Sequence, residues 1–186
     1  MTALIRRRRA IFPKMYTDRP IPEELIREIL ENANWAPTHK MTEPWRFKVF
    51  QGEARKRLGD YMGAYYQAHT PPEAFSELKF NKVRNNPVRS AAVIAIIMQR
   101  DPDERLPEWE EIAAVAAAVQ NMWLTCTAHG IGSYWSTPGA ILQADDFLKL
   151  KPGERCLGLF YMGYHDMGDL PGKRSPVEEK VEWLFE

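Results

Sequence analysis

The chain has 186 residues, of which 45% are apolar and 27% charged, and its 25 basic and 25 acidic residues give a formal net charge of zero. This balance argues against nucleic acid as the main partner, because phosphate binding needs a net basic face. No segment has the roughly 18 consecutive apolar residues of a membrane span, and the two cysteines form neither a disulfide framework nor a CxxC motif. We therefore expect a single cytoplasmic domain over residues 1–186, without a membrane partner.

The N-terminal segment combines a short predicted helix, Thr2–Arg7, with the arginine run Arg6 to Arg9. No apolar segment of signal-peptide type follows this basic start. Core-seeking residues follow the run at once, which indicates that some of the arginines are held in a fixed place. Arginine has a planar fork of donors that suits phosphate. The run is thus either an anion site or a solvated basic face.

An amphipathic helix is predicted after Pro22, where two glutamates occupy the first turn and apolar residues repeat at helical spacing from Leu25 to Ala33. The stretch N-W-A-P-T-H-K-M-T-E-P-W-R-F follows at 34–47, and its two prolines bar helical geometry in the residues before them. Alternation from Trp45 to Gln51 then predicts a strand. An irregular stretch with two Trp, a His and a Lys is typical of a site, but a wide turn capping the core would explain it as well.

Two helices are predicted next, at 54–68 and, more weakly, at 75–83, the second stopped by Asn85-Asn86-Pro87. The continuous apolar run at 91–98 predicts a strand buried on both faces. Residues 108–129 predict a long helix with Gly130 as its C′ residue. That helix is apolar almost all round, and a chain of this size can hardly cover some 30 Å of it alone. We therefore expect a second subunit on its alanine-rich face.

The segment from Gly130 to Gly139 combines two glycines, a short aromatic strand and a turn, which would let backbone amides approach a flat ligand. It is not a dinucleotide-binding fingerprint, because it is not a GxGxxG after a strand. A short helix at 145–150 and a strand at 155–164 are predicted after it. The tail carries the basic pair Lys173 and Arg174, followed by apolar residues that need to be buried.

The usual constellations of self-sufficient catalysis are missing. The four histidines lie far apart without metal-ligand spacing, so no metal site is expected, and no G-x-S-x-G motif occurs. A protein of this kind borrows its chemistry from a cofactor. Arginines at one end, a basic pair at the other and aromatic strips between them suit a flat heterocycle that carries a phosphate.

These pieces together resemble the FMN-dependent nitroreductase family, and within it the branch of small NAD(P)H nitroreductases. The resemblance rests on an N-terminal R-R-x near residue 7, D-R-P-I-P-E-E-L-I before a helix, A-P-T-H-K-M-T-E-P-W-R-F, an alanine-rich helix ending in H-G-I-G-S, and a strand ending in M-G-Y. It covers nearly the whole chain. One departure is an arginine at the position where many members have serine, which leaves the phosphate contacts open.

The resemblance implies an α+β sandwich, with a central, mainly antiparallel sheet wrapped by helices, built as an intertwined homodimer. The tail, about residues 172–186, would wrap the partner subunit, and FMN would lie at the subunit interface. By the same resemblance, the cofactor-binding residues are Arg7, Arg8, Arg9, Trp35, His39, Trp135, Ser136, Thr137 and Arg174. The residues near the nicotinamide nucleotide are Thr125, Cys126, Thr127, Ala128, His129 and Gly130.

The resemblance also implies a reaction. Hydride would pass from NAD(P)H through flavin N5 to a small acceptor of the nitroaromatic or quinone type, in two half-reactions that share one slot and give ping-pong kinetics. His39 and Lys40 are the candidate catalytic residues, since a fixed donor or cation is needed near flavin N1. Alternatives are reductive dehalogenation or flavin breakdown on the same fold, or a non-catalytic dimeric module that binds anions.

Overall fold

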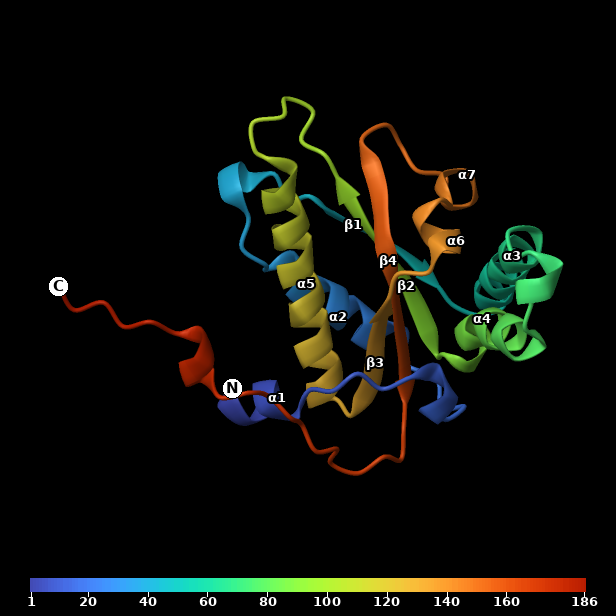
Figure 1. The fold of residues 1–186 in the computed structure, drawn as a ribbon, viewed down its shortest axis with the longest axis horizontal. Helices are drawn as coiled ribbons and strands as arrows, with labels where there is room; N and C mark the ends of the chain where they lie inside the picture. Colours follow the sequence, from blue (N-terminus) through green and yellow to red (C-terminus); the bar gives the residue numbers. More distant parts are fainter.

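The computed structural model describes residues 1–186, which form one four-stranded antiparallel sheet covered by helices on both faces (Figure 1). The strand order is β1-β2-β4-β3. The strands are β1 (Trp45–Phe50), β2 (Ala92–Gln99), β3 (Ile131–Ser136) and β4 (Glu154–Tyr164). The helices are α1 (Thr2–Arg7), α2 (Glu23–Asn34), α3 (Glu53–Ala68), α4 (Glu77–Arg89), α5 (Glu108–Ala128), α6 (Gly139–Leu142) and α7 (Asp145–Leu148). The predicted α+β class with an antiparallel sheet is confirmed.

Strand β2 lies at the centre of the molecule and contributes to two separate cores. Ile94 and Ile96 face α2 and α5, whereas Val93 and Ile97 face α3, α6 and α7. All four side chains are fully buried. Because successive side chains of a strand point to opposite faces, a continuous apolar run is what burial on both faces requires. The prediction for 91–98 is confirmed.

Helix α5 begins after Pro107 and ends at Ala128, with Gly130 beyond it at a φ of 68°, as predicted for the C′ residue. Its inner face is buried against the sheet and α2, whereas Ala113 on its outer face is exposed and Ala116 and Ala117 are only half-buried. The chain itself therefore covers one side of this apolar helix, and its small-residue side remains open.

The predicted end of the helix at 75–83 is wrong, because α4 continues through Pro87 to Arg89. Pro87 lies in the last turn, where its missing N–H removes a single helical hydrogen bond. Packing against α3 outweighs this loss: Gly59 has no side chain, and the backbone of Arg84 occupies the space that a Cβ would need. Ser76 caps the start of α4 by accepting from the Lys79 amide at 3.3 Å.

The chain after β4 has little regular structure beyond a single 3₁₀ turn at Val177–Lys180. Its end extends away from the body (Figure 1), and Trp183, Leu184 and Phe185 are 72–87% exposed. Scattered single apolar residues are normal on a surface, whereas a group of three at the end of the chain is unusual. None of the helices is long and apolar enough to pass through a bilayer.

Candidate functional site

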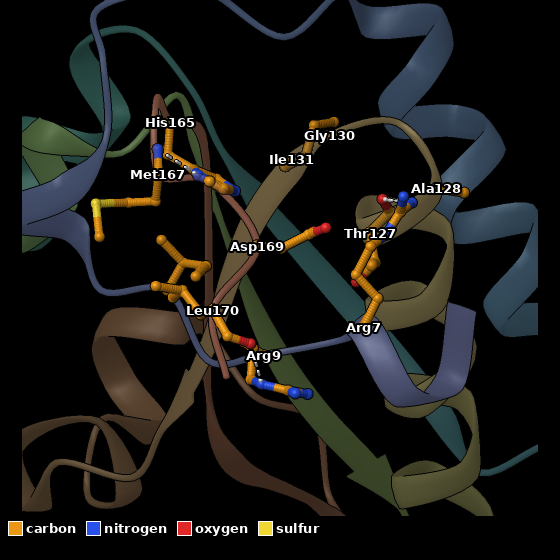
Figure 2. A pocket seen from close by; sticks show the side chains of 12 residues that line it. Arg7, Arg9, Thr127, Ala128, Gly130, Ile131, His165, Met167, Asp169 and Leu170 are labelled. Carbon is orange, nitrogen blue, oxygen red and sulfur yellow. Dashed lines mark hydrogen bonds between the residues drawn. The ribbon is translucent and has the colours of Figure 1, made fainter. Parts of the chain in front are cut away.

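A cavity of about 350 Å³ lies where the C-terminal end of α5 meets the N-terminal arm and the segment that follows β4 (Figure 2). Three distant parts of the sequence line it, and several of its side chains are polar or charged. The lining residues are Arg7, Arg9, Ile11, Thr127, Ala128, Gly130, Ile131, His165, Met167, Gly168, Asp169 and Leu170.

The N-terminal arm is fixed beside this cavity by contacts to α5 and β3. Arg7 Nη2 donates to the Thr127 carbonyl at 3.2 Å, and the guanidinium of Arg8 lies over the Trp123 ring at 4.6 Å. The Ile11 amide donates to the Ser133 carbonyl at 3.0 Å, which adds the arm to the edge of the sheet. The arginine run is therefore held in place, as the apolar residues after it indicate.

The arginines at this end of α5 have no carboxylate partners. None of Arg7, Arg8, Arg9 and Arg174 lies within 4.0 Å of an acidic oxygen, although Asp169 is among the residues around the cavity. Burial, and then the positive charges of Arg174 and Arg9, lower the pKa of Arg8. The guanidinium fork matches the geometry of phosphate, so these arginines without acidic partners fit a phosphate group.

The predicted nucleotide stretch from Thr125 to Gly130 divides between the cavity and the core. Thr127, Ala128 and Gly130 line the cavity. Thr125 Oγ1 donates to the Asn121 carbonyl and accepts from the Asn32 amide, and His129 Nε2 lies 3.1 Å from Glu28 Oε1. The side chains of Thr125 and His129 thus hold α5 to α2.

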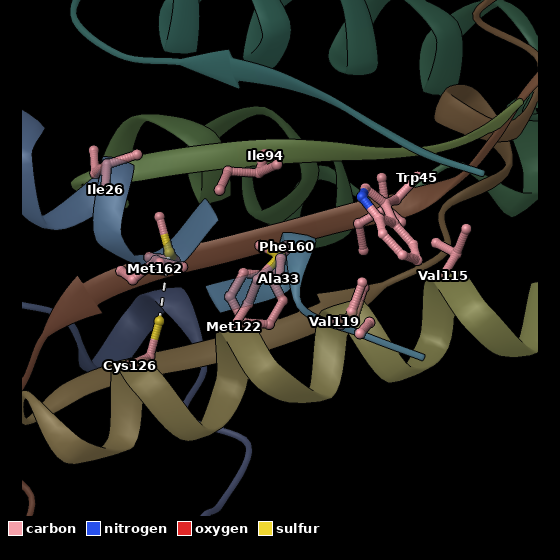
Figure 3. Close-up of a cluster of buried hydrophobic side chains, with 14 of the residues drawn as sticks. Ile26, Ala33, Trp45, Ile94, Val115, Val119, Met122, Cys126, Phe160 and Met162 are labelled. Carbon is pink, nitrogen blue, oxygen red and sulfur yellow. Dashed lines mark hydrogen bonds between the residues drawn. The ribbon is translucent and has the colours of Figure 1, made fainter. Parts of the chain in front are cut away.

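Cys126, the remaining residue of that stretch, points into the core (Figure 3). Its side chain is fully buried, and its Sγ lies 3.6 Å from the sulfur of Met162. Burial raises the pKa of the thiol to about 12, so it stays protonated and unreactive. The side chain of Cys126 packs with its neighbours and has no surface to offer a nucleotide.

Within the 34–47 stretch, His39 and Lys40 lie at the opposite, N-terminal end of α5, whereas Trp35 lies beside the end of α2. Trp35 is 79% exposed, and its Nε1 donates to Glu31 at 3.0 Å. His39 Nδ1 is 2.8 Å from Glu110 Oε2, and Lys40 Nζ donates to the Arg105 carbonyl at 3.1 Å. A two-proline segment is thus tied down by its polar side chains.

This tied-down segment also carries unusual backbone geometry. Lys40, Met41 and Glu43 have φ values of 50°, 54° and 41°, which side-chain-bearing residues rarely adopt. Strain of this kind persists where surrounding contacts impose it, and it is concentrated at functional sites. Lys149 has the same φ of 50° at the end of α7, outside the predicted site, so this geometry fits both a site and a turn.

Within one chain the two groups of predicted residues do not meet. Arg7 contacts α5 at Thr127, whereas His39 contacts it at Glu110. At 1.5 Å of rise per residue these contact points are about 25 Å apart along the helix. A single subunit therefore presents an arginine cluster at one end of α5 and a histidine–lysine cluster at the other.

The end of β3 carries the remaining predicted cofactor residues. Trp135 Nε1 donates to the Leu157 carbonyl at 3.1 Å, Ser136 pairs with Leu159, and Thr137 is exposed in the following turn. Gly158 has a φ of 133°, and a Cβ there would lie 2.6 Å from Trp135 Nε1. Gly158 therefore lets the indole lie flat along the neighbouring strand.

Sequence reasoning missed the cavity residues after β4, which are His165, Met167, Asp169 and Leu170. His165 Nδ1 accepts from the Met167 amide at 3.2 Å, which forms a local turn. The stretch H-D-M-G-D-L has no periodicity and no motif. The one feature of this stretch that could have indicated a site is its polar side chains immediately after a predicted strand.

Comparisons with known proteins identify the family of this chain. The Nitroreductase family model matches residues 5–164. "Putative NAD(P)H nitroreductase YfhC" of Bacillus subtilis is 29% identical over 180 residues, which is 95% of this chain and 90% of that protein.

Two solved structures are similar over almost their whole length. A nitroreductase-like protein from Bacillus cereus has a TM-score of 0.80 and 29% identity, covering 98% of this chain and 95% of that one. A nitroreductase from Desulfovibrio desulfuricans, solved in complex with FMN, has a TM-score of 0.74 and 26% identity, covering 100% and 97%. With the family model spanning most of the sequence, this chain belongs to the nitroreductase family.

Proposed function

We propose that this protein is an FMN-dependent oxidoreductase that passes hydride from NAD(P)H to a small nitroaromatic or quinone acceptor by a ping-pong mechanism. The observation that carries the proposal is the set of arginines around Arg8, which are crowded and have no acidic partners. Membership of the nitroreductase family and a relative of similar fold solved with FMN support it.

Each group of residues has a role in this proposal. Arg7, Arg8 and Arg174, with Arg9 beside them, hold the cofactor phosphate and ribityl chain, and Trp135 to Thr137 line the ring. FMN supplies, when bound, the two-electron chemistry that the chain's own side chains lack. The cavity beside Thr127, Ala128 and Gly130 is open to the nicotinamide nucleotide.

The separation of the two clusters along α5 supports a homodimer with shared sites. A two-fold axis that crosses the open alanine face of α5 would pack two copies of the helix in opposite directions. The arginine end of one copy would then lie beside the His39 end of the other. His39 and Lys40 would stabilise negative charge that develops on the cofactor. The exposed tail, about residues 172–186, would cover the partner subunit.

The first experiment concerns the cofactor. The purified protein should be yellow, and denaturation should release FMN rather than FAD, since the chain has arginines for one phosphate and no dinucleotide fingerprint. NAD(P)H oxidation should then be coupled to a nitroaromatic or a quinone. A colourless protein that takes up no added FMN would refute the proposal. Flavin binding without reduction of either acceptor would favour another flavin chemistry.

The second experiment tests the shared site. We expect Arg7→Ala and His39→Ala to be inactive separately, and a mixed dimer to hold one doubly damaged site and one intact site. Random pairing makes about half the dimers mixed, so roughly a quarter of wild-type activity should return after the two variants are refolded together. If His39→Ala is active alone, Trp35→Ala replaces it. No recovery in dimers shown to have mixed would rule out the shared site.

A further inference from the structure

Arg9 differs from the arginines beside it because its guanidinium is already bonded to the chain's own backbone. Its Nε donates to the Leu170 carbonyl at 3.0 Å. Its Nη1 donates to the carbonyls of Arg6 at 2.7 Å and Arg8 at 2.8 Å. These three bonds use most of the N–H donors that a guanidinium has. Arg7, in contrast, makes one long bond, to Thr127.

Gly172 packs directly against this guanidinium. A Cβ at residue 172 would overlap Arg9 Nη2, whereas a Cβ at Gly168, in the same segment, would have nothing within 4 Å. The backbone of Gly172 is not in the left-handed region, so glycine is needed there for space and not for conformation. To accommodate an alanine, either the Arg9 guanidinium or the backbone at residue 172 has to shift, and either shift disturbs the contact between them.

The segment that Arg9 holds leads immediately to Arg174. Leu170 and Gly172 precede the basic pair of the tail, and Arg174 is close enough to Arg8 to affect its charge equilibrium. The residues around Arg174 are exposed, and the nearest anchor before it is the Arg9 contact. A lysine could not replace Arg9, because one ammonium group cannot reach carbonyls on two sides as a planar fork does.

We propose that Arg9 is a positioning residue that fastens residues 170–172 to the N-terminal arm and so places Arg174 beside Arg7 and Arg8. This inference rests on the proposed FMN site and divides its arginines: Arg7, Arg8 and Arg174 contact the anion, whereas Arg9 holds the tail.

The decisive variant is Gly172→Ala, which removes no cation, with Gly168→Ala as its matched control. Two quantities are measured: the Kd of the apoprotein for FMN, and the rate at which trypsin releases residues 175–186 from the FMN-free protein. We expect Gly172→Ala to raise the Kd about tenfold, the scale of a lost bond to a charged group, and to speed cleavage by a similar factor. Gly168 lines the cavity, so Gly168→Ala is the control for cleavage alone: it should be cut at the wild-type rate, and the thermal midpoint of both variants should stay unchanged.

Arg9→Lys and the double variant Arg9→Ala/Gly172→Ala distinguish positioning from direct contact. We expect Arg9→Lys to bind FMN as weakly as Arg9→Ala, although it keeps the charge. The double variant should be no worse than Arg9→Ala alone, because the clash at 172 disappears with the guanidinium. The proposal would be overturned if Arg9→Lys bound FMN as tightly as the wild type and the losses of the two single variants added up in the double variant. If the wild type takes up no FMN, the proposed function fails, and equal cleavage rates of Gly172→Ala and the wild type would separately overturn the fastening of the tail.

Discussion

The two ends of α5 carry similar numbers of cations but treat them in opposite ways. At the N-terminal end Arg100 pairs with the buried Glu111, Arg105 pairs with Asp101 at 2.8 Å, and His39 lies against Glu110. At the C-terminal end Arg7, Arg8 and Arg174 have no acid within ion-pair distance. The arginines at the N-terminal end are thus paired with acids, whereas those at the C-terminal end are not.

The dipole of α5 contributes to this difference between its two ends. Acids in the first turn of α5, including Glu110 and Glu111, are stabilised by the positive end of the helix dipole, and Arg7 donates to a carbonyl at the negative end. This effect is modest for any one charge, about 0.3–1 kcal/mol. It is therefore too small to account by itself for several unpaired arginines at one end of the helix.

The largest expected effect comes from breaking the proposed dimer, in which the arginine end of one α5 lies beside the His39 end of the other. Ala116→Glu places a charge on the half-buried alanine face at the middle of α5. If that face forms the dimer interface, the unpaired carboxylate should cost several kcal/mol and abolish both dimerisation and flavin binding. Ala64→Glu, on the exposed face of α3, is the control and should leave both intact. Sedimentation and flavin content are the measurements, and a folded, flavin-bound monomer would show that the interface lies elsewhere.

The second prediction tests whether the N-terminal end is structural. Glu111 is 1% exposed; it accepts from Arg100 and, at 2.8 Å, from the Asp101 amide. Glu111→Ala leaves these donors without their acceptor, and we expect it to lower the free energy of unfolding by about 3 kcal/mol. Glu108→Ala removes an ion pair whose two side chains are about half exposed, so it should cost less than about 1 kcal/mol. Urea denaturation of both variants measures the difference, and equal losses would contradict it.

Elements whose signal is local could be predicted from the sequence. The apolar run of β2, and the alanine-rich α5 with Gly130 just beyond its end, could be predicted without knowledge of their neighbours. Hydrophobic period, helix propensity and cap residues lie within each segment. The continuation of α4 through Pro87 could not be predicted in this way. It depends on the missing side chain of Gly59 in another helix, which lets α4 pack closely enough to keep its last turn.

The site shows the same limit. The arginine run and the 34–47 stretch were recognisable by residue type, since guanidinium groups and an irregular aromatic loop suggest chemistry by themselves. The burial of Cys126 depends on which helix face meets the sheet, and the cavity residues His165 and Asp169 depend on where the chain turns after β4. Unlike Arg7 and Arg8, Arg9 is bonded to the carbonyl of Leu170, which is 161 positions away in the sequence.

The third prediction tests the unpaired arginines at the C-terminal end of α5. Arg7→Ala should weaken FMN binding by about 1.5–3 kcal/mol, the usual scale for a hydrogen bond to a charged group. The free energy of unfolding should barely change, because Arg7 is an exposed residue that makes one bond to the protein. Arg27→Ala, which removes an exposed arginine from α2, is the control and should change neither quantity. Flavin titration of the apoprotein and urea denaturation give the two values. An unchanged affinity for FMN would mean that the arginine run is a solvated basic face.

The smallest effect depends on pH and concerns Asp101, at the N-terminal end of α5. Hydrogen bonds from the Arg105 side chain lower the pKa of Asp101 from 3.8 to about 2, opposed by burial. A carboxyl whose pKa is lower in the folded state stabilises the fold above its unfolded pKa, and this contribution is lost as the pH falls through the folded value. The contribution of Asp101 should therefore be complete at about pH 6 and disappear between about pH 4 and pH 2.

Asp101→Asn keeps the shape of the side chain and removes this titration. We expect the variant to be less stable than the wild type at about pH 6 and the difference between their thermal midpoints to shrink steadily below about pH 4. Asp103→Asn is the control, because Asp103 is 77% exposed and lies 3.9 Å from the same arginine, at the limit of an ion pair. It should follow the wild type at every pH, since exposed pairs contribute little. Parallel curves for Asp101→Asn and the wild type would mean that Arg105 does not hold the Asp101 carboxylate. Arg105, at the N-terminal end of α5, would then lack a hydrogen-bonded acidic partner, as the arginines at the other end do.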